Sequence, residues 1–364
     1  MKVVFDVTSC AKQRKGGIAN YGWQLIQACG RIAPENDYRL GVRLNRWPKR
    51  EYLNGLVPGV SPKLLVDGLD PLLWGSSADV FMGVGVRLPS RFSCPRVAMI
   101  HDINVFEVPE ISTPNWVQVR QEKIVQTISR ADMMLTPSEL GRQALHQTLG
   151  VPLEQIRAVS LGYNENLFKE PEEEMLARTL IKYNLNQRPY LITLGSYGER
   201  KNQSGLIQAF AHSELSKDWC LVFAGVRDGQ EQIQEQARCM GLEENRFKII
   251  PWVEEEELPV LIGGAAFYCC PSLHEGYGLP VIESQACGTP VLASNRGALP
   301  ETLGRCGILF DPELEEDFIA GLERMAEDPV LRKGFAEQGL KRVQAESTWD
   351  HVAAKTLAIF KELC

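Results

Sequence analysis

The chain has 364 residues and a formal net charge of −7. This length exceeds what one hydrophobic core usually supports, so we expect two domains. The composition, 44% hydrophobic and 23% charged, excludes a disordered or fibrous protein. The negative charge also argues against a nucleic-acid partner, because neutralising phosphates requires clustered lysine and arginine.

The cysteines and the N-terminal sequence indicate the cellular compartment of the protein. The ten cysteines form no C-x-x-C pair, and several, such as Cys269 and Cys270, lie in apolar runs. They are typical of reduced core residues rather than zinc ligands or disulfides. The first apolar run is too short for a signal peptide, and no stretch approaches about 18 apolar residues. We expect a cytoplasmic protein, with peripheral contact at the inner membrane face left open.

In the first half of the chain, short apolar runs alternate with segments of helical period. This alternation is typical of βα units and parallel sheets. Strands are predicted at residues 3–7, 38–44, 96–102 and 156–164, helices at 17–32 and about 115–130, and a strand running into a capped helix over 131–150.

A second series of βα units follows a polar segment. Residues 169–189 are charged and carry proline near both ends, which indicates a linker. Beyond them, strands are predicted at 190–196, 219–225, 247–253, 265–272 and 289–294. The sequence therefore predicts an α/β protein with two doubly wound parallel sheets. The N-terminal domain spans 1–168 and the C-terminal domain 190–346, and an amphipathic helix at about 347–364 packs back on the first domain.

The most informative stretch is residues 271–294, "PSLHEGYGLPVIESQACGTPVLAS", which carries Glu275 and Glu283. A strand ends near its start, a glycine-rich loop follows, and a helix begins at about Leu279. Unpaired N–H groups and the helix dipole make such a start an anion site. Glu283 is expected in the first turn, where it could accept hydrogen bonds from ribose, and Glu275 on the loop toward a sugar. On spacing alone, two solvent-facing glutamates beside an ordinary turn are an equal alternative.

The segment from Gly195 to Asn202, "GSYGERKN", follows the first predicted strand of the second domain. Ligands of open α/β sheets bind outside the carboxyl ends of the strands. Arg200 and Lys201 are therefore placed to neutralise a diphosphate, although such a pair is commonly plain surface charge.

The first domain offers weaker candidates. Gly16 and Gly17 follow the first strand and open a helix, so they form either a simple turn or a place where backbone N–H groups meet a phosphate. His101 ends a predicted strand and is either structural or part of the site. The sequence contains no P-loop, H-E-x-x-H or D-x-D motif, so no metal and no resident cofactor are expected.

Together these segments resemble family 4 of the retaining glycosyltransferases, also called group 1, whose GT-B fold has two Rossmann-like domains facing each other across a cleft. Residues 271–294 are similar to the family's E-x7-E region, 194–202 to its Arg-Lys clamp, and 159–168 to its domain-closing strand. The family's first-domain motifs resemble residues 16–25, 101–110 and 135–145. The resemblance covers most of the chain in the family's order.

The resemblance assigns roles to the second-domain candidates. Arg200 and Lys201 would hold the diphosphate, Glu283 the ribose and Glu275 the hydroxyls of the donor sugar. Backbone groups complete the donor site, those near Gly195, Tyr277, Gly278 and Leu279 at the phosphates and those of Trp252 and Val253 at the nucleobase.

In the first domain, the resemblance implies that Gly16 and Gly17 approach the phosphate or the acceptor, with His101 beside the reacting carbon of the sugar. The chain departs from the family pattern at Tyr277, which replaces a common Phe, and at Arg305 and Cys306, where Asp-Ala is frequent. Residues 45–95, expected to help form the acceptor wall, match no family motif.

The resemblance implies a retaining, metal-independent hexosyltransferase that uses a sugar nucleotide as substrate. Attack from the front face, assisted by the leaving phosphate, needs no covalent nucleophile on the protein. The first-domain motifs look most like bacterial mannosyltransferases of polysaccharide assembly, so GDP-mannose leads and UDP-glucose follows. The acceptor would be a glycan or a lipid-linked saccharide. Two rival classes stay open, a GT-B epimerase or hydrolase and a non-enzymatic subunit that binds a sugar nucleotide.

Overall fold

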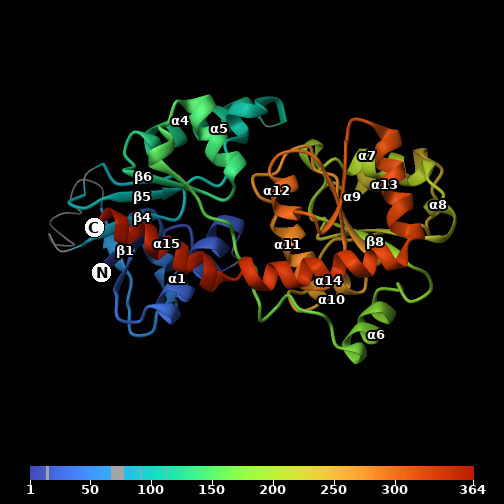
Figure 1. Cartoon of the computed structure of the whole chain (residues 1–364), viewed down its shortest axis with the longest axis horizontal. Helices are drawn as coiled ribbons and strands as arrows, with labels where there is room; N and C mark the ends of the chain where they lie inside the picture. Colours follow the sequence, from blue (N-terminus) through green and yellow to red (C-terminus); the bar gives the residue numbers. More distant parts are fainter. Residues whose placement is uncertain (14–15, 67–77, 91, 112) are drawn as a thin grey trace. The chain divides into compact units, whose positions relative to one another are not determined.

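The structure is a computed structural model that describes residues 1–13, 16–66, 78–90, 92–111 and 113–364. The chain divides into two compact units, the first formed by Met1–Gly162 with Thr348–Cys364 and the second by Tyr163–Ser347. Each unit is built on its own parallel sheet with helices packed on both faces (Figure 1). The predicted pair of doubly wound α/β sheets is confirmed.

The first unit contains a seven-stranded sheet in the order β3-β2-β1-β4-β5-β6-β7. Every pairing is parallel. The order runs outward from β1 to β3 and then restarts at β4 on the other side of β1, so the switch point lies between β1 and β4. The strands are β1 (Lys2–Asp6), β2 (Asp37–Arg43), β3 (Lys63–Leu65), β4 (Val80–Gly83), β5 (Arg96–Met99), β6 (Met133–Thr136) and β7 (Ile156–Ala158).

Two groups of helices cover this sheet. Helices α1 and α15 pack together on one face, and α4 and α5 lie on the other (Figure 1). The helices are α1 (Gly17–Ile32), α3 (Asn104–Glu107), α4 (Pro114–Ile128), α5 (Glu139–Leu149) and α15 (Trp349–Leu363), with 3-10 turns η1 (Leu44–Leu53), η2 (Pro109–Ile111) and η3 (Leu153–Gln155).

The second unit has a six-stranded parallel sheet in the order β10-β9-β8-β11-β12-β13, so its switch point lies between β8 and β11. The strands are β8 (Tyr190–Leu194), β9 (Cys220–Ala224), β10 (Phe247–Ile250), β11 (Phe267–Cys270), β12 (Val291–Ser294) and β13 (Gly307–Phe310).

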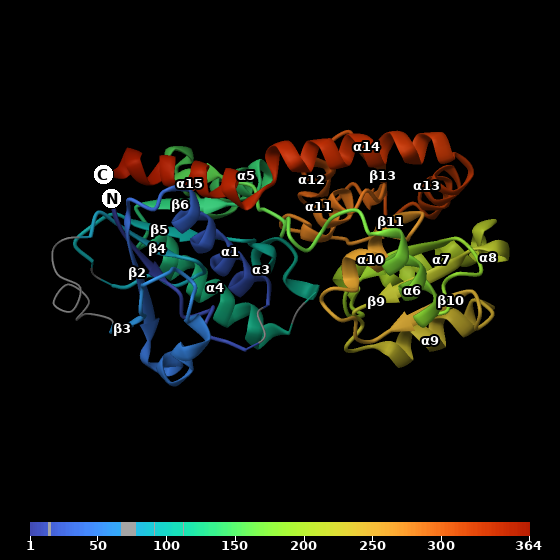
Figure 2. The ribbon, with the colours of Figure 1, turned by 90° about the horizontal axis from the view of Figure 1, so that it is seen from below.

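The helices of the second unit also form two layers. On one face α7 packs against α9 and α13, and on the other α11 packs against α10, α12 and α14. The long α14 lies beside α11 (Figure 2). The helices are α6 (Glu173–Lys182), α7 (Gln203–His212), α8 (Leu215–Asp218), α9 (Gln230–Cys239), α10 (Leu258–Gly263), α11 (Leu279–Ala286), α12 (Leu299–Leu303), α13 (Glu315–Glu327) and α14 (Pro329–Glu346), with the 3-10 turn η4 (Glu199–Lys201).

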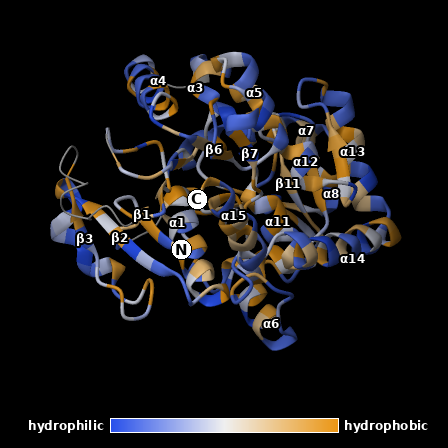
Figure 3. Cartoon of the chain, turned by 60° about the vertical axis from the view of Figure 1, so that its left-hand side comes forward, coloured by the Kyte–Doolittle hydropathy of each residue, from blue (hydrophilic) through white to orange (hydrophobic). Residues whose placement is uncertain are grey.

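Burial explains why these short runs become strands. All five residues of β9, "CLVFA", are buried, as expected for a strand covered on both faces by helices. In the second unit, one hydrophobic cluster fills the α7 face of the sheet and another the α11 face. Hydrophobic residues follow the strands, whereas helices such as α4 and α5 carry both hydrophilic and hydrophobic residues (Figure 3).

The structure adds elements that the sequence did not predict. Strand β4 lies at the centre of the first sheet, and β3 and β13 lie at edges. Each of these three strands is only three or four residues long. The acceptor-wall segment 45–95 contains β3, β4 and most of η1, while its residues 67–77 and 91 lie outside the described residues.

The domain boundaries also differ from the predicted ones. The first unit ends at Gly162, and residues 169–189 contain helix α6, which packs on α10 within the second unit. The segment is polar because α6 is a surface helix with acidic residues in its first turn, which its dipole favours. Helix α15 packs on α1 in the first unit. None of the described helices is both long enough and apolar enough to cross a membrane.

Replacing Phe360 in α15 with alanine is expected to lower the free energy of unfolding by about 3–5 kcal/mol, because the ring is fully buried, with its centroid 6.3 Å from that of Phe5. Urea denaturation followed by tryptophan fluorescence measures the loss. Lys355→Ala, at an exposed position of the same helix, is the control and should change stability by less than about 0.5 kcal/mol. Equal effects of the two substitutions would contradict the packing of α15.

Candidate active site

The residues predicted to bind the diphosphate lie in two loops at the switch point of the second sheet. The loop after β8 leads through η4 to α7, and the loop after β11 leads to α11. Because β8 and β11 are neighbouring parallel strands, their carboxyl ends meet at one edge of the sheet. The chain leaves them toward opposite faces, which is the arrangement that opens a ligand crevice in α/β sheets.

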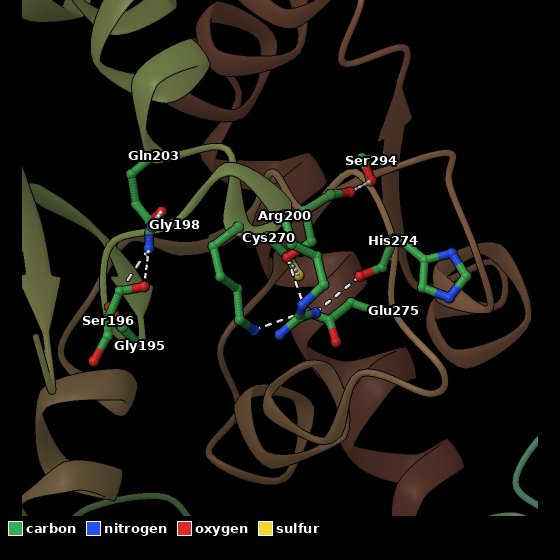
Figure 4. A network of polar contacts seen from close by, with 11 residues as sticks. Gly195, Ser196, Gly198, Arg200, Gln203, Cys270, His274, Glu275 and Ser294 are labelled. Carbon is green, nitrogen blue, oxygen red and sulfur yellow. Dashed lines mark hydrogen bonds and ion pairs between the residues drawn. The ribbon is translucent and has the colours of Figure 1, made fainter. Parts of the chain in front are cut away.

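Glu275 is the centre of this cluster. Its Oε1 atom lies 2.7 Å from Nζ of Lys201 and 2.9 Å from Nη1 of Arg200. The same oxygen accepts a hydrogen bond of 2.9 Å from Oγ of Ser272. Figure 4 shows the Arg200 guanidinium directed at the Glu275 carboxylate. The structure thus brings together three residues that were predicted from two separate motifs.

Main-chain contacts fix the two loops to each other. The N–H of Leu273 donates to the carbonyl of Arg200 at 2.8 Å. In addition, Nη1 of Arg200 donates to the carbonyl of His274 at 2.9 Å (Figure 4). The hydroxyl of Ser294, at the end of β12, donates to the carbonyl of Ser272. The two cations are therefore held in place by the protein before any ligand binds, as electrostatic preorganisation requires.

The charge state of Glu275 follows from its surroundings. Burial by itself would raise the pKa of this carboxyl, whose side chain is 13% exposed, but the adjacent Lys201 and Arg200 charges outweigh burial and lower the pKa. Glu275 is thus ionised at neutral pH. One carboxylate facing two cations leaves one excess positive charge at the cluster, which favours an anionic ligand.

The loop after β8 is shaped by Gly195 and by a residue that had no role predicted from the sequence. Gly195 adopts a φ of +107°, a conformation that side chains rarely permit. The buried Gln203 donates from Nε2 to the carbonyl of Ser196 at 2.8 Å, and its Oε1 accepts from the N–H of Gly198 at 3.2 Å. A polar residue in the first turn of an apolar helix was the available signal. Gln203 fixes the path of the chain into η4.

The predicted glycine turn and helix start are present after β11. Gly278 caps α11 with a φ of +96°, and a Cβ there would lie 2.8 Å from Cδ2 of Leu299. Tyr277 is buried, and its carbonyl accepts a hydrogen bond from the hydroxyl of Thr302. The helix begins at Leu279, so its first N–H groups follow the Glu275 loop directly.

The position of Glu283 differs from the predicted one. Four residues of α11 precede it, so it lies in the second turn of the helix and not in the first. Burial raises the pKa of its carboxyl to about 7, and no charged neighbour contributes to that shift. Glu283 is therefore protonated over much of the range below neutrality, in contrast to Glu275.

The proposed base-contacting residues follow β10, at the edge of the same sheet. The indole Nε1 of Trp252 donates to Oε1 of Glu254 at 3.1 Å, and the Arg227 guanidinium lies 4.9 Å from the indole ring. Trp252 is 44% exposed, whereas Val253 packs against the core. Because β9 and β8 separate β10 from β11, these residues lie at the same sheet edge as Glu275 but are not part of its network.

In the first unit, Gly16 caps α1 and Gly17 is its first residue. Among the residues that the structure describes, no atom lies within 4 Å of a Cβ built at either position, so packing against them requires neither glycine. An unoccupied approach at a helix start is compatible with a role toward a ligand.

His101 follows β5 and is partly buried. Its ring meets the ring of Tyr21 edge-on at 4.8 Å, and its Nε2 lies 3.3 Å from the carbonyl of Val84. Burial lowers the pKa of the imidazole to about 4, so His101 is neutral at physiological pH. A neutral imidazole whose Nε2 is hydrogen-bonded to a carbonyl oxygen carries its ring proton on Nε2. Among the described residues, no group of three or more His, Cys, Asp or Glu is arranged to hold a metal ion.

Glu283→Gln is expected to raise the free energy of unfolding by about 1–2 kcal/mol at pH 8 and by much less at pH 5. The folded-state pKa of about 7 exceeds the ordinary 4.5, so the native protein loses stability as pH rises from 4.5 to 7. Glutamine has no carboxyl group to ionise, so the variant does not lose this stability as pH rises. Urea unfolding at both pH values tests it against Glu337→Gln, whose side chain is 69% exposed. An equal gain at pH 5 and pH 8 would show that Glu283 is not held protonated by burial.

Comparison with known proteins agrees with this geometry. The family described as "Glycosyl transferases group 1" matches residues 178–342, within the second unit. The O-antigen chain mannosyltransferase B of Escherichia coli is 27% identical over 286 residues, which cover 78% of this chain and 74% of that protein. The MMP alpha-(1->4)-mannosyltransferase of Mycolicibacterium hassiacum is 26% identical over 77% of this chain and 68% of that protein.

The solved structures extend the likeness to the whole fold. Sucrose-phosphate synthase of Thermosynechococcus elongatus superposes with a TM-score of 0.77 over 100% of this chain and 98% of that chain, at 20% identity. That identity supports the shared fold alone. The family match and the mannosyltransferase relatives support a group 1 glycosyltransferase that is similar to mannosyltransferases, and the superposition shows that the chain shares the GT-B fold.

Proposed function

We propose that this glycosyltransferase moves a hexose, with mannose from GDP-mannose as the leading candidate, to a glycan or lipid-linked saccharide, with retention and without a metal ion. One observation carries the proposal: Arg200 and Lys201 are fixed on Glu275 at the switch point of the second sheet. The named activities of its relatives in Escherichia coli and Mycolicibacterium hassiacum support mannose.

The chemistry asks the site to stabilise a leaving diphosphate. As the bond between the anomeric carbon and the phosphate oxygen breaks, negative charge grows on the phosphates. Arg200 and Lys201 supply positive charge there, and the first N–H groups of α11 add the positive end of a helix dipole. This arrangement provides the charge compensation that a divalent metal supplies in other transferases.

The two glutamates take different tasks because their charge states differ. Glu275 is ionised and orients both cations, and its carboxylate can also accept hydrogen bonds from donor-sugar hydroxyls. Glu283, whose pKa burial raises to about 7, lies on α11 and would bond the ribose hydroxyls. Neither glutamate is proposed as a covalent nucleophile.

Retention follows if the acceptor hydroxyl attacks from the face that the diphosphate leaves. The acceptor oxygen then forms the new bond to the anomeric carbon, the bond to the phosphate oxygen breaks, and the acceptor proton passes to the departing diphosphate. A neutral His101 would position the sugar and would not donate a proton at pH 7, since burial holds its pKa near 4.

UDP-glucose is the alternative donor. Release of hexose without an acceptor would instead indicate a hydrolase, and binding without turnover a non-enzymatic subunit. Product analysis with and without an acceptor panel separates these outcomes.

Lys201→Ala is expected to reduce transfer about 10²- to 10³-fold and to weaken nucleoside diphosphate binding, because one of two cations facing the phosphates is lost. Glu275 keeps its contact with Arg200, so the variant should fold. Lys217→Ala, at an exposed lysine of the same unit that pairs with Glu214, is the matched control.

Thermal-shift titrations with GDP, UDP and ADP, with and without EDTA, accompany the kinetics. A ligand at 100 times its dissociation constant should add about 2.7 kcal/mol of stability. Stabilisation by GDP that survives EDTA and disappears in Lys201→Ala is the expected result. No stabilisation by any of the three nucleotides would refute the proposed donor site.

Gly17→Ala is expected to slow transfer at least about tenfold while leaving the free energy of unfolding unchanged or raised by less than about 1 kcal/mol. The new methyl group meets no described atom within 4 Å but narrows the approach to the start of α1. Gly30→Ala in the same helix, where the nearest atom lies 3.7 Å from the added Cβ, is the control. Full activity in Gly17→Ala would assign the glycine to a simple turn.

A further inference from the structure

The first unit contains a pocket that the proposed donor site does not use. Its volume is about 270 Å³, and it lies at the carboxyl ends of β1 and β4, the pair of strands at which the order of the first sheet switches. Switch points are where open α/β sheets bind ligands. The lining residues are Asp6, Thr8, Ser9, Lys12, Ile18, Asn45, Arg46, Val84, Gly85, Val86, Arg87, Arg120 and Lys123.

The lining is strongly basic although the chain as a whole carries a net charge of −7. Its five cations come from four segments of the chain, namely Lys12, Arg46, Arg87, and Arg120 with Lys123 on α4. None of them forms an ion pair within the part of the chain that the structure describes. A solvated surface of this protein would intersperse acidic residues among so many cations.

The one carboxylate of this lining does not balance the cations. Oδ2 of Asp6 lies 2.9 Å from Nε of Arg43, a residue outside the lining, and Oδ1 accepts a hydrogen bond of 3.0 Å from the N–H of Thr8. Asp6 is therefore already neutralised by Arg43. The pocket keeps a positive charge of about five, the sum of its lining cations at neutral pH.

Arg120 gives an independent sign that a ligand is accommodated here. Its Nε is buried and has no hydrogen-bond partner among the described residues. A buried donor left without an acceptor costs about 1–3 kcal/mol, so native proteins rarely keep one without a reason. An oxygen of an anion in this pocket would provide that acceptor. Lys123 lies one turn further along α4 and lines the same pocket.

We propose that this pocket binds the phosphate or diphosphate group of the saccharide acceptor, so that the acceptor is a phosphorylated saccharide. The inference rests on the proposed transferase function and adds the chemical class of the acceptor. A single carboxylate would leave most of the positive charge uncompensated, whereas a phosphate or diphosphate carries more charge and matches the forked donors of three arginines. The hydroxyls of Thr8 and Ser9 add neutral donors to the same lining.

The test measures binding of inorganic pyrophosphate to the full chain saturated with GDP, by isothermal titration calorimetry. Saturation with GDP keeps pyrophosphate out of the donor site. The pocket variant is the triple substitution Arg46→Gln, Arg87→Gln and Lys123→Gln. The matched control replaces three exposed lysines of the same unit outside the pocket, Lys63→Gln, Lys355→Gln and Lys361→Gln.

Wild type and control are expected to bind pyrophosphate with dissociation constants within twofold of each other, and the pocket variant at least tenfold more weakly, with GDP affinity equal in all three. Equal pyrophosphate affinity in the pocket variant overturns the proposal, as does complete loss of pyrophosphate binding when GDP saturates the wild type. Failure of GDP itself to bind refutes the donor site instead, so the two failures are distinguishable.

Competition against pyrophosphate then identifies the source of the phosphate. Displacement by a hexose 1-phosphate assigns a soluble sugar phosphate, and displacement only by a short-chain polyprenyl diphosphate saccharide in detergent assigns a lipid-linked acceptor. Displacement by the uncharged methyl mannoside at the same concentration would show that the pocket recognises the sugar ring and not the phosphate, and would overturn the proposal.

Discussion

The ion pairs of Glu275 with Arg200 and Lys201 are the constraint on which the second unit's site depends. Two cations at one strand end repel each other, and the single ionised carboxylate holds both at one oxygen. Packing around the main chain of Glu275 leaves this residue little freedom. The carbonyl of Glu275 accepts from the N–H of Ala298 at 2.9 Å, and a Cβ on Gly297, whose φ is +57°, would lie 2.5 Å from that same oxygen. The loop after β12 therefore supports the loop after β11, and the charges are positioned by three neighbouring strands rather than by one flexible loop.

Burial acts in opposite directions on His101 and Glu283. It lowers the pKa of His101 to about 4 and raises that of Glu283 to about 7. Near pH 6 both side chains are therefore neutral, and the charges of the proposed donor site in the second unit come from the Glu275 cluster. The effects on stability also oppose each other. His101 makes the folded protein more stable as pH rises from 4 to 6.5, while Glu283 makes it less stable between 4.5 and 7. If the free energy of unfolding changed little with pH in this range, the effects of the two pKa shifts would be cancelling each other.

How much the sequence could predict depended on how far apart the relevant residues lie in the chain. Arg200 and Lys201 are adjacent and follow a strongly apolar strand, so their place at a strand end could be predicted, and so could the glycine turn before α11. Strand β4 was missed because its four residues give too short a pattern, yet it pairs with β1 at the centre of the sheet. Gln203 could not be assigned a role, since its partners are main-chain atoms of a loop whose path depends on tertiary packing. The basic pocket was out of reach for the same reason, because its cations are scattered between residues 12 and 123 and only the strand order gathers them.

The two sheets use their switch points in a similar way, and the comparison bears on what the first one binds. In the second unit, two cations share one carboxylate, so the excess charge is small and the cluster is stable without a ligand. In the first unit, the lining carboxylate is committed to Arg43 and the surrounding cations are unmatched. Unmatched charge of one sign in a confined volume destabilises the folded state unless a counter-charge binds. A protein with a net charge of −7 has ample acidic residues with which to relieve it. That none lies in this lining beyond Asp6 argues that the counter-charge arrives with the acceptor.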